Sequence, residues 1–458
     1  MSLIIVNYDY YIRNKTITRS TFQMKKKNRV KPIKTSFTGG NLTNYSGIYP
    51  LFKFMQKIGI NHLFEQKISI KASPNQKYSI SQIFTAILLG VLSGMNRLIK
   101  IENFTLDPLV RYLLEIEDKL DIDTIRYHLK KFGIRQTTEL TEIFGILSRK
   151  VHKHLQTKRD ILDLDSTVKT VYGRQQGSEK GYNPSHKGKR SYHPLLAFLN
   201  STRECLLAWL RPGDAHTSNN ADEFLKQALS MLSQELKHLT VRADSGFFNE
   251  KVIQVVESHK HFHYLIKVKM RNLKSLLRKQ EWDKIPGLAG YEMTEFYYKA
   301  SGWSKARRFV AVRIYRGMKA TDSLFPYRDY AYFCYVTNIE ESPLYLHRLY
   351  GDRGESENWI EAVKNQLYAA TILTNSFWTN ETLFLLSVMA YNLSVWLRKL
   401  TDEKAWHQEP LSFRLWFIQL AGKFISSGRV RHLKMYSSYY YKSWWSKIDA
   451  GIDSLSFA

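Results

Sequence analysis

Two short apolar segments that each end in an aspartate constrain the fold of this chain most. The first, Asp160-Ile-Leu-Asp-Leu-Asp165, alternates leucines with aspartates, so its leucines and its later aspartates lie on opposite faces of a predicted strand. The second, Leu239–Ala243, runs directly into Asp244. A helical pattern between the two strands predicts an α/β protein. If the strands are neighbours, Asp165 and Asp244 meet at one edge of the sheet.

Other segments extend this pattern. Strands are predicted over Tyr192–Leu199, Glu204–Leu210 and His263–Val268. Helices are predicted over Asn219–Lys237 and Asn380–Arg398, and a further helix after Phe248 is predicted to end at Ser258. Residues 273–340 interrupt the rhythm of strands and helices, so they are predicted to form a β-rich insertion. The predicted strands of the insertion are Tyr291–Ala300, Ala306–Arg316 and Tyr330–Ile339.

A predicted helix from about Asp352 could bring a third carboxylate to the two aspartates. Residues three and four apart share a face of a helix. The polar residues at this spacing fall on one stripe: Arg353, Glu357, Glu361 and Lys364. The apolar residues fall on the opposite side: Trp359, Val363, Leu367 and Ala370. The apolar side is predicted to be buried, and the polar stripe is either a solvated surface with an Arg353–Glu357 pair or a surface that faces a substrate.

Asp165, Asp244 and Glu357 together would make a set of ligands for a metal ion. Three carboxylates without His or Cys suit a hard cation, Mg²⁺ or Mn²⁺. Two such ions about 4 Å apart could activate a water or a 3′-hydroxyl at a phosphodiester. The alternatives are a turn residue for Asp165 and a helix N-cap for Asp244. Asp163 shares a face with Asp165 and remains an alternative to it.

The charge balance points to a nucleic acid as partner. The chain has 458 residues, and 68 lysines and arginines outnumber 41 aspartates and glutamates, which gives a net charge of +27. A hydrophobic content of 44% excludes a disordered basic protein. Cys205 and Cys334 cannot build a disulfide framework or a zinc site, which favours the cytoplasm. Neither a signal peptide nor a membrane span is expected, since Ile80–Leu92 and Leu383–Leu397 are shorter than the ~20 residues of a span.

Several basic segments are candidates for contact with DNA. An N-terminal arm is densest in charge at Lys25–Lys34, where phosphate contact and a solubilising tail are equally open interpretations. Residues 46–158 have a helical pattern, with Ser79 or Ser81 as a cap, and Asp123–Phe132 could be a recognition helix. The loop Tyr172–Arg190 mixes glycine, aromatic and basic residues. Its DNA-contact candidates are Lys180, Lys187, Lys189 and Arg190.

The motifs at these positions resemble a known family. Tyr350, Arg353, Glu357 and Lys364 stand at the spacing Y-x2-R-x3-E-x6-K. The acidic motifs are Asp165-Ser-Thr and Arg242-Ala-Asp-Ser-Gly-Phe247, and two further matches are Lys180-Gly-Tyr-Asn and Gly188-Lys-Arg-Ser-Tyr-His-Pro-Leu195. The chain resembles the bacterial insertion-sequence DDE transposases with the Y-R-E-K signature, in the insertion sequence 4 superfamily and close to the insertion sequence 1380 subgroup.

The resemblance implies an RNase H-like catalytic core with a β-rich insertion, preceded by a helical N-terminal DNA-binding region. It implies a homodimer that cuts and pastes paired transposon ends in double-stranded DNA, with no membrane and no small-molecule substrate. Asp165, Asp244 and Glu357 would bind metal, while Tyr350, Arg353 and Lys364 would contact DNA. The Ser-Thr pair after Asp165 favours it over Asp163.

The expected division of the chain rests on these patterns. The six parts are a basic arm (1–45), a helical DNA-binding region (46–158), the first part of the core (159–272), the insertion (273–340), the second part of the core with the glutamate helix (341–400) and a basic aromatic C-terminal region (401–458).

Trp303 is a further DNA-contact candidate, because it lies in a turn beside Lys305, Arg307 and Arg308. An exposed indole there could stack on an extruded base if the second strand is cut through a hairpin. A Trp303 folded back onto its own sheet is the alternative, and Trp282 is a second candidate for the stacking role.

Two other functions remain open. One is an RNase H-like metal-dependent nuclease that cuts DNA without strand transfer. The other is a non-catalytic DNA-binding protein derived from a transposase, although such a protein would have no use for three carboxylates facing a polyanion.

Overall fold

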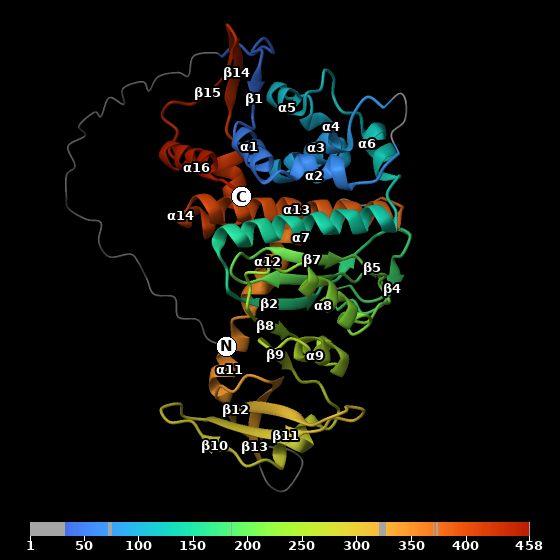
Figure 1. Cartoon of the computed structure of the whole chain (residues 1–458), viewed down its shortest axis with the longest axis vertical. Coiled ribbons are helices and arrows are strands. Elements are labelled where there is room, and N and C mark those ends of the chain that lie inside the picture. Colours follow the sequence, from blue (N-terminus) through green and yellow to red (C-terminus); the bar gives the residue numbers. More distant parts are fainter. Residues whose placement is uncertain are drawn as a thin grey trace, which may run out of the picture. The chain divides into compact units, whose positions relative to one another are not determined.

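One nine-stranded sheet organises the part of the chain that the computed structural model describes, residues 33–71, 76–184, 186–319, 327–369, 371 and 374–457 (Figure 1). Its strand order is β10-β11-β12-β13-β9-β8-β2-β6-β7. The strands of its first half in sequence are β2 (Arg159–Ser166), β6 (Leu195–Leu199), β7 (Cys205–Trp209), β8 (His238–Ala243) and β9 (Phe262–Lys267). β2 pairs with β8 in parallel, and β8 pairs with β9 in parallel.

The β2–β8 pairing confirms that the two aspartate-ending strands are neighbours. Their register aligns Asp163 with Arg242 and Leu164 with Ala243. The next residues along each strand, Asp165 and Asp244, therefore lie at the same edge of the sheet, because adjacent parallel strands end on the same side.

The insertion is β-rich as predicted, but its strands belong to the same sheet. β10 (Asp283–Lys284), β11 (Tyr291–Tyr298), β12 (Arg307–Lys319) and β13 (Tyr327–Thr337) pair antiparallel in sequence order. β13 then pairs with β9, so the insertion extends the main sheet. It also contains the short helix α10 (Leu273–Arg278), and α11 (Pro343–Gly351) packs on β12.

A single predicted strand over Tyr192–Leu199 is wrong, because the segment divides at Pro194. Proline has no N–H to give to a ladder, so a strand seldom continues through it. β5 (Arg190–Tyr192) joins a small sheet with β3 (Lys169–Thr170) and β4 (Glu179–Lys180), while β6 stays in the main sheet. The helix predicted over Asn219–Lys237 is shorter than expected, because α8 spans only Ala221–Ser230. The next helix, α9, spans Glu250–Glu257.

Two long helices cover the sheet. α7 (Ile134–Leu155) and α13 (Phe377–Thr401) pack against each other and against β7 (Figure 1). α13 is long and apolar enough to cross a membrane, but 89% of its most apolar stretch is buried inside the protein. Its apolar side chains therefore serve as core, as predicted.

The helical region before β2 packs on the other side of α13. Its helices are α1 (Ile48–Ile58), α2 (Ile60–Lys67), α3 (Ile80–Ser93), α4 (Leu98–Phe104), α5 (Pro108–Leu114) and α6 (Ile122–Leu129). Ser79 caps α3 in a reciprocal pair of hydrogen bonds with Gln82, which confirms the predicted start. α6 starts after the cap Asp121 and ends three residues before the expected Phe132.

The C-terminal residues fold onto this helical layer. α14 (Glu403–Trp406), α15 (Pro410–Phe413), β14 (Gly422–Ser427), β15 (Val430–Met435) and α16 (Lys442–Ser454) come after α13. β14 pairs with β1 (Leu42–Thr43), and α16 packs on α13 and α1. Trp444 stacks on Trp416 with ring centroids 4.4 Å apart. Residues 41–458 thus form one compact unit, and the six-part division stays a prediction.

Candidate active site

Asp165, the last acidic residue of β2, lies in a nearly dry environment. Its side chain is only 13% exposed, and one oxygen accepts the Arg353 guanidinium at 2.8 Å. The other oxygen accepts the Ser166 amide at 2.7 Å. Burial raises the pKa of Asp165 to about 6. This value already includes a decrease from the charge of Arg353 and smaller increases from Asp244 and Glu357.

Asp244 comes directly after β8 and caps the short turn Ser245–Phe247 by accepting the Gly246 amide at 2.9 Å. The interpretation of Asp244 as a cap is therefore correct, and this capping hydrogen bond uses only the Oδ1 oxygen of Asp244. Gly246 is required by close approach, because a Cβ there would lie 2.8 Å from Cγ2 of Thr217. The Thr217 hydroxyl also bonds the Ser166 hydroxyl at 3.0 Å, which ties the turns after β2 and β8 together. Sequence reasoning missed Thr217, which no motif marks.

Glu357 lies on α12 (Gly354–Glu361) with its side chain exposed. The opposite side of the helix is buried as predicted, through Trp359 and Val363. The Arg353–Glu357 pair of the solvated-surface alternative is not among the ion pairs of the described residues. Arg353 instead contacts Asp165 and donates to the carbonyl of Leu164 at 3.2 Å. The Arg353 end of the polar stripe thus faces the end of β2, where the charge of Glu357 also acts on Asp165.

The regular helix predicted through Lys364 is wrong, because α12 continues into a π-helical turn, Ala362–Gln366. A π turn inserts a residue into the helical register and rotates the side chains beyond it. Lys364 is half-buried and donates to the hydroxyl of Thr167 at 2.9 Å, two residues beyond Asp165. Burial lowers the pKa of Lys364, against the charge of Glu361.

Tyr350 belongs to the same cluster. It lies near the end of α11 with its ring 4.6 Å from that of Tyr335. The pKa of Tyr350 is raised to about 12, mainly by burial, and this value includes a decrease from Arg353 and increases from the carboxylates of Asp244 and Asp165. Tyr350 is therefore a neutral hydroxyl beside the acidic residues.

Asp163, the alternative to Asp165, is fully buried and engaged. Arg242 binds both of its oxygens, each at 2.7 Å, and donates to the carbonyl of Leu349 at 2.6 Å. This arrangement leaves Asp163 no oxygen free for a ligand. The pair instead links β2 and β8 to the end of α11, next to Tyr350.

The basic loop 172–190 folds around the small sheet. Lys180, Lys187 and Lys189 are exposed, as a contact with DNA requires. Arg190 is different, because it donates to the carbonyl of Ser178 at 2.8 Å and to Glu179 at 2.9 Å. Its guanidinium is thus used inside the loop. Of the segment Lys25–Lys34, all but the last two residues lie outside the described part.

The exposed indole expected at Trp303 is not found. Trp303 is 9% exposed, lies 5.0 Å from the ring of Phe248, and has the Arg307 guanidinium 4.9 Å above its face. The turn folds back because Ser304 donates to Glu250 at 2.7 Å and Arg307 bridges Glu250 and Glu257. The indole cannot stack on a base in this conformation.

Trp282 is also covered. Its ring N–H donates to the carbonyl of Leu277 at 3.1 Å, and Arg313 lies 4.4 Å from its ring.

The carboxylates do not form a ready metal cluster. Within the described ranges, no three His, Cys, Asp or Glu side chains stand close enough together to hold an ion. The donor set is nevertheless made only of oxygens, which suits a hard cation. Arg353 supplies the positive charge that balances Asp165.

Adjacent parallel strands ending in aspartates, with a glutamate helix at their edge, are consistent with an RNase H-like core. The chain belongs to the family of transposase DDE domains, group 1, which it matches over residues 25–456. A similar solved structure is the cryo-EM structure of a piggyBac transposase synaptic complex with hairpin DNA. It is 13% identical and has a TM-score of 0.43, over 80% of this chain and 78% of that chain. No curated protein sequence matches.

Proposed function

We propose that this protein is a cut-and-paste DNA transposase of an insertion sequence, of the Y-R-E-K group and the insertion sequence 1380 subgroup. It would cleave phosphodiesters at terminal inverted repeats and transfer the freed strand to target DNA. The observation that carries this proposal is the parallel pairing of β2 and β8, which brings Asp165 and Asp244 to one edge of the sheet in a chain that matches the transposase DDE family over residues 25–456. Carboxylates that oppose one another's ionisation favour the binding of a cation between them.

Asp165, Asp244 and Glu357 would bind two divalent cations, either Mg²⁺ or Mn²⁺. When bound, they would supply Lewis acidity at the phosphate and a more acidic water or 3′-hydroxyl. Arg353 would release Asp165 and turn to the DNA phosphate, since a guanidinium binds either group through the same donors. Lys364 and Tyr350 flank the carboxylates and would orient the strand.

The substrate that we propose is double-stranded DNA, bound by a homodimer on two transposon ends in the bacterial cytoplasm. The net charge of +27 and the exposed Lys180, Lys187 and Lys189 support a polyanion.

The test is cleavage of duplex DNA that carries the element's ends, with Mg²⁺ present. We expect Asp165→Asn, Asp244→Asn and Glu357→Gln each to abolish cleavage while retaining binding. Glu361→Gln is the matched control, because Glu361 is an exposed glutamate on the same helix.

The products separate the alternatives. Joining of the cleaved end to a target plasmid supports a transposase, whereas cleavage without joining supports a nuclease. Binding without any cleavage by the parent protein would indicate a non-catalytic DNA-binding protein and would contradict the proposal.

A further inference from the structure

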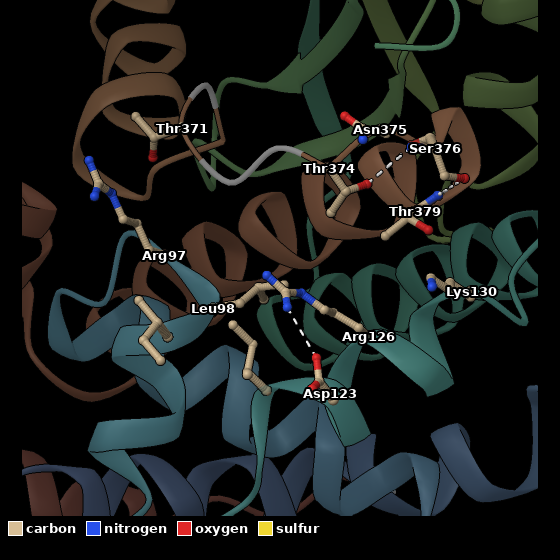
Figure 2. A pocket seen from close by; sticks show the side chains of 12 residues that line it. Arg97, Leu98, Asp123, Arg126, Lys130, Thr371, Thr374, Asn375, Ser376 and Thr379 are labelled. Atoms are coloured by element: carbon tan, nitrogen blue, oxygen red, sulfur yellow. Dashed lines mark hydrogen bonds and ion pairs between the residues drawn. The ribbon is translucent and has the colours of Figure 1, made fainter. Parts of the chain in front are cut away.

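A pocket of about 880 Å³ lies between the helical region and the segment that enters α13 (Figure 2). We propose that this pocket binds the phosphodiester backbone of duplex DNA and is a contact region separate from the active site. The inference rests on the proposed function for its choice of polyanion.

Three cationic side chains line the pocket from the helical region. They are Arg97, which precedes α4, and Arg126 and Lys130, which lie one turn apart at α6. All three are exposed. The acidic residue among the lining residues is Asp123, and Arg126 pairs with it at 3.1 Å. Within the described part of the chain, Arg97 and Lys130 have no ion pair, so the pocket keeps an excess of positive charge.

The opposite wall offers uncharged polar groups. Figure 2 shows Arg126 and Lys130 on one side and Thr374, Ser376 and Thr379 on the other. Ser376 caps α13 by accepting the amide of Thr379, so the positive end of a 25-residue helix dipole also lies at this wall. The hydroxyls of Thr374 and Thr379 donate inside the protein, to Asn380 and to the carbonyl of Leu129, so this wall contributes the helix dipole to the pocket.

The composition of the pocket suits a sugar–phosphate chain better than base recognition. Apolar residues Leu98 and Ile122 lie among the polar ones. The apolar face of α6 is buried through Ile125 and Leu129, and its basic residues Arg126 and Lys130 line the pocket. Its exposed basic side remains, and such side chains position the backbone rather than read sequence. The recognition helix predicted at Asp123–Phe132 stays a prediction, and the present inference concerns only backbone contact by its basic side chains.

The wall of the pocket is joined to the basic loop 172–190 by hydrogen bonds of Gln176. The Gln176 amide donates to the carbonyl of Asn375 at 3.0 Å, and the Phe377 amide donates to the side chain of Gln176 at 3.2 Å. Gln176 belongs to the same loop as the exposed Lys180, Lys187 and Lys189. A duplex that contacts this loop can thus continue toward the pocket.

The experiment is a titration of fluorescent end DNA at several salt concentrations. Each phosphate contact adds about 0.9 to the slope of log affinity against log salt on duplex DNA. We expect the triple variant Arg97→Gln, Arg126→Gln, Lys130→Gln to lower the slope by about 2 to 3. The single variant Lys130→Gln, at an exposed position, should lower it by about 1.

The matched control removes the same charge elsewhere. Lys226, Lys237 and Lys260 are exposed, on α8 or in the segments after α8 and α9, and their triple change to Gln should leave the slope unchanged. An equal fall in both triple variants would mean that only net charge acts, and would overturn the inference, as would an unchanged slope in the pocket variants. Melting temperatures confirm that each variant is folded.

A mononucleotide serves as a competitor. If it displaces DNA from the parent protein but not from the pocket variant, the pocket is a small-molecule site and the inference is wrong. Cleavage distinguishes the two proposals. If the parent protein cleaves end DNA and the pocket variants have the same salt slope as the parent, only the inference about the pocket is wrong. If the parent neither binds nor cleaves, both fail.

Discussion

Asp163 and Asp165 stand two residues apart on one face of β2, and packing gives them different tasks. Arg242 neutralises Asp163 in a fully buried pair. Asp165 shares its surroundings with two more carboxylates, while Arg353 balances its charge. The first aspartate therefore holds the structure together, and the second is available for chemistry.

Substitution should separate these tasks. Asp163→Asn leaves a buried guanidinium without its counter-charge, which costs about 3–5 kcal/mol of unfolding free energy. Asp165→Asn should change stability far less, because the loss of the Arg353 pair is offset by relief from acidic neighbours, yet it should abolish cleavage. Urea unfolding and the cleavage assay measure both. Loss of cleavage in a stable Asp163→Asn protein would move the catalytic role to Asp163.

The buried pair of His152, on α7, and Glu204 predicts that the stability of the protein depends on pH. Burial would lower the pKa of His152, but the charge of Glu204, 3.4 Å away, outweighs burial and raises it above 6.5. Burial would likewise raise the pKa of Glu204, but His152 and hydrogen bonds from Ser148 and Trp396 lower it below 4.5. At a pH above the pKa of Glu204 and below the pKa of His152, both groups are charged and their ion pair stabilises the fold.

The contribution of His152 is fully present below its unfolded-state pKa and is lost as the pH rises through its folded-state pKa. The difference in unfolding free energy between the parent and His152→Gln should therefore be largest near about pH 6 and shrink toward about pH 9. Chemical unfolding across this range provides the measurement. A difference that does not vary with pH would show that His152 contributes through packing alone.

At the scale of elements, the insertion is fixed to the core by side chains at the turn between β11 and β12. Arg307 bridges Glu250 and Glu257 of α9, and Trp303 fills the space between this turn and Phe248. These contacts and the β13–β9 ladder join the insertion to the sheet of the core.

Trp303→Ala should consequently act on stability rather than on base stacking. Removal of a buried indole typically costs about 3–5 kcal/mol. Amide hydrogen exchange should rise in β11, β12 and α9, while nicking of end DNA continues below the lowered melting temperature. Tyr297→Ala, at an exposed tyrosine on β11, is the control for the loss of an aromatic ring. A Trp303→Ala protein with unchanged exchange that loses a hairpin product would instead restore the stacking role.

At the scale of the whole molecule, the compact unit begins at Asn41 and extends to Ala458. The strand β1 begins at Leu42 and pairs with β14, so a truncation should end before it.

Removal of residues 1–40 should leave the melting temperature unchanged and weaken binding to DNA. The segment carries the basic run that begins at Lys25, and each phosphate contact that is lost lowers the salt slope by about 0.9. Binding titrations of the truncated and full-length proteins test this expectation. If affinity and slope both stay the same, the arm is a solubilising tail.

The sequence by itself determined the order of the elements and the residue types of the site. The alternation before Asp165 and Asp244 and the helical spacing around Glu357 are local patterns, and local geometry is enough to assign them a face. The same motifs indicate the family, because their order and spacing can be read from the sequence alone.

Only the tertiary structure decided which of these residues act together. That Asp163 pairs with Arg242, that Arg353 contacts Asp165 instead of Glu357, and that Trp303 folds inward depend on partners far away in sequence. The same holds for the pocket between α6 and the start of α13, whose walls are about 250 residues apart, as the contact of Thr379 with Leu129 shows. Burial and charge pairing are set by the neighbours that folding supplies, and a local pattern does not contain them.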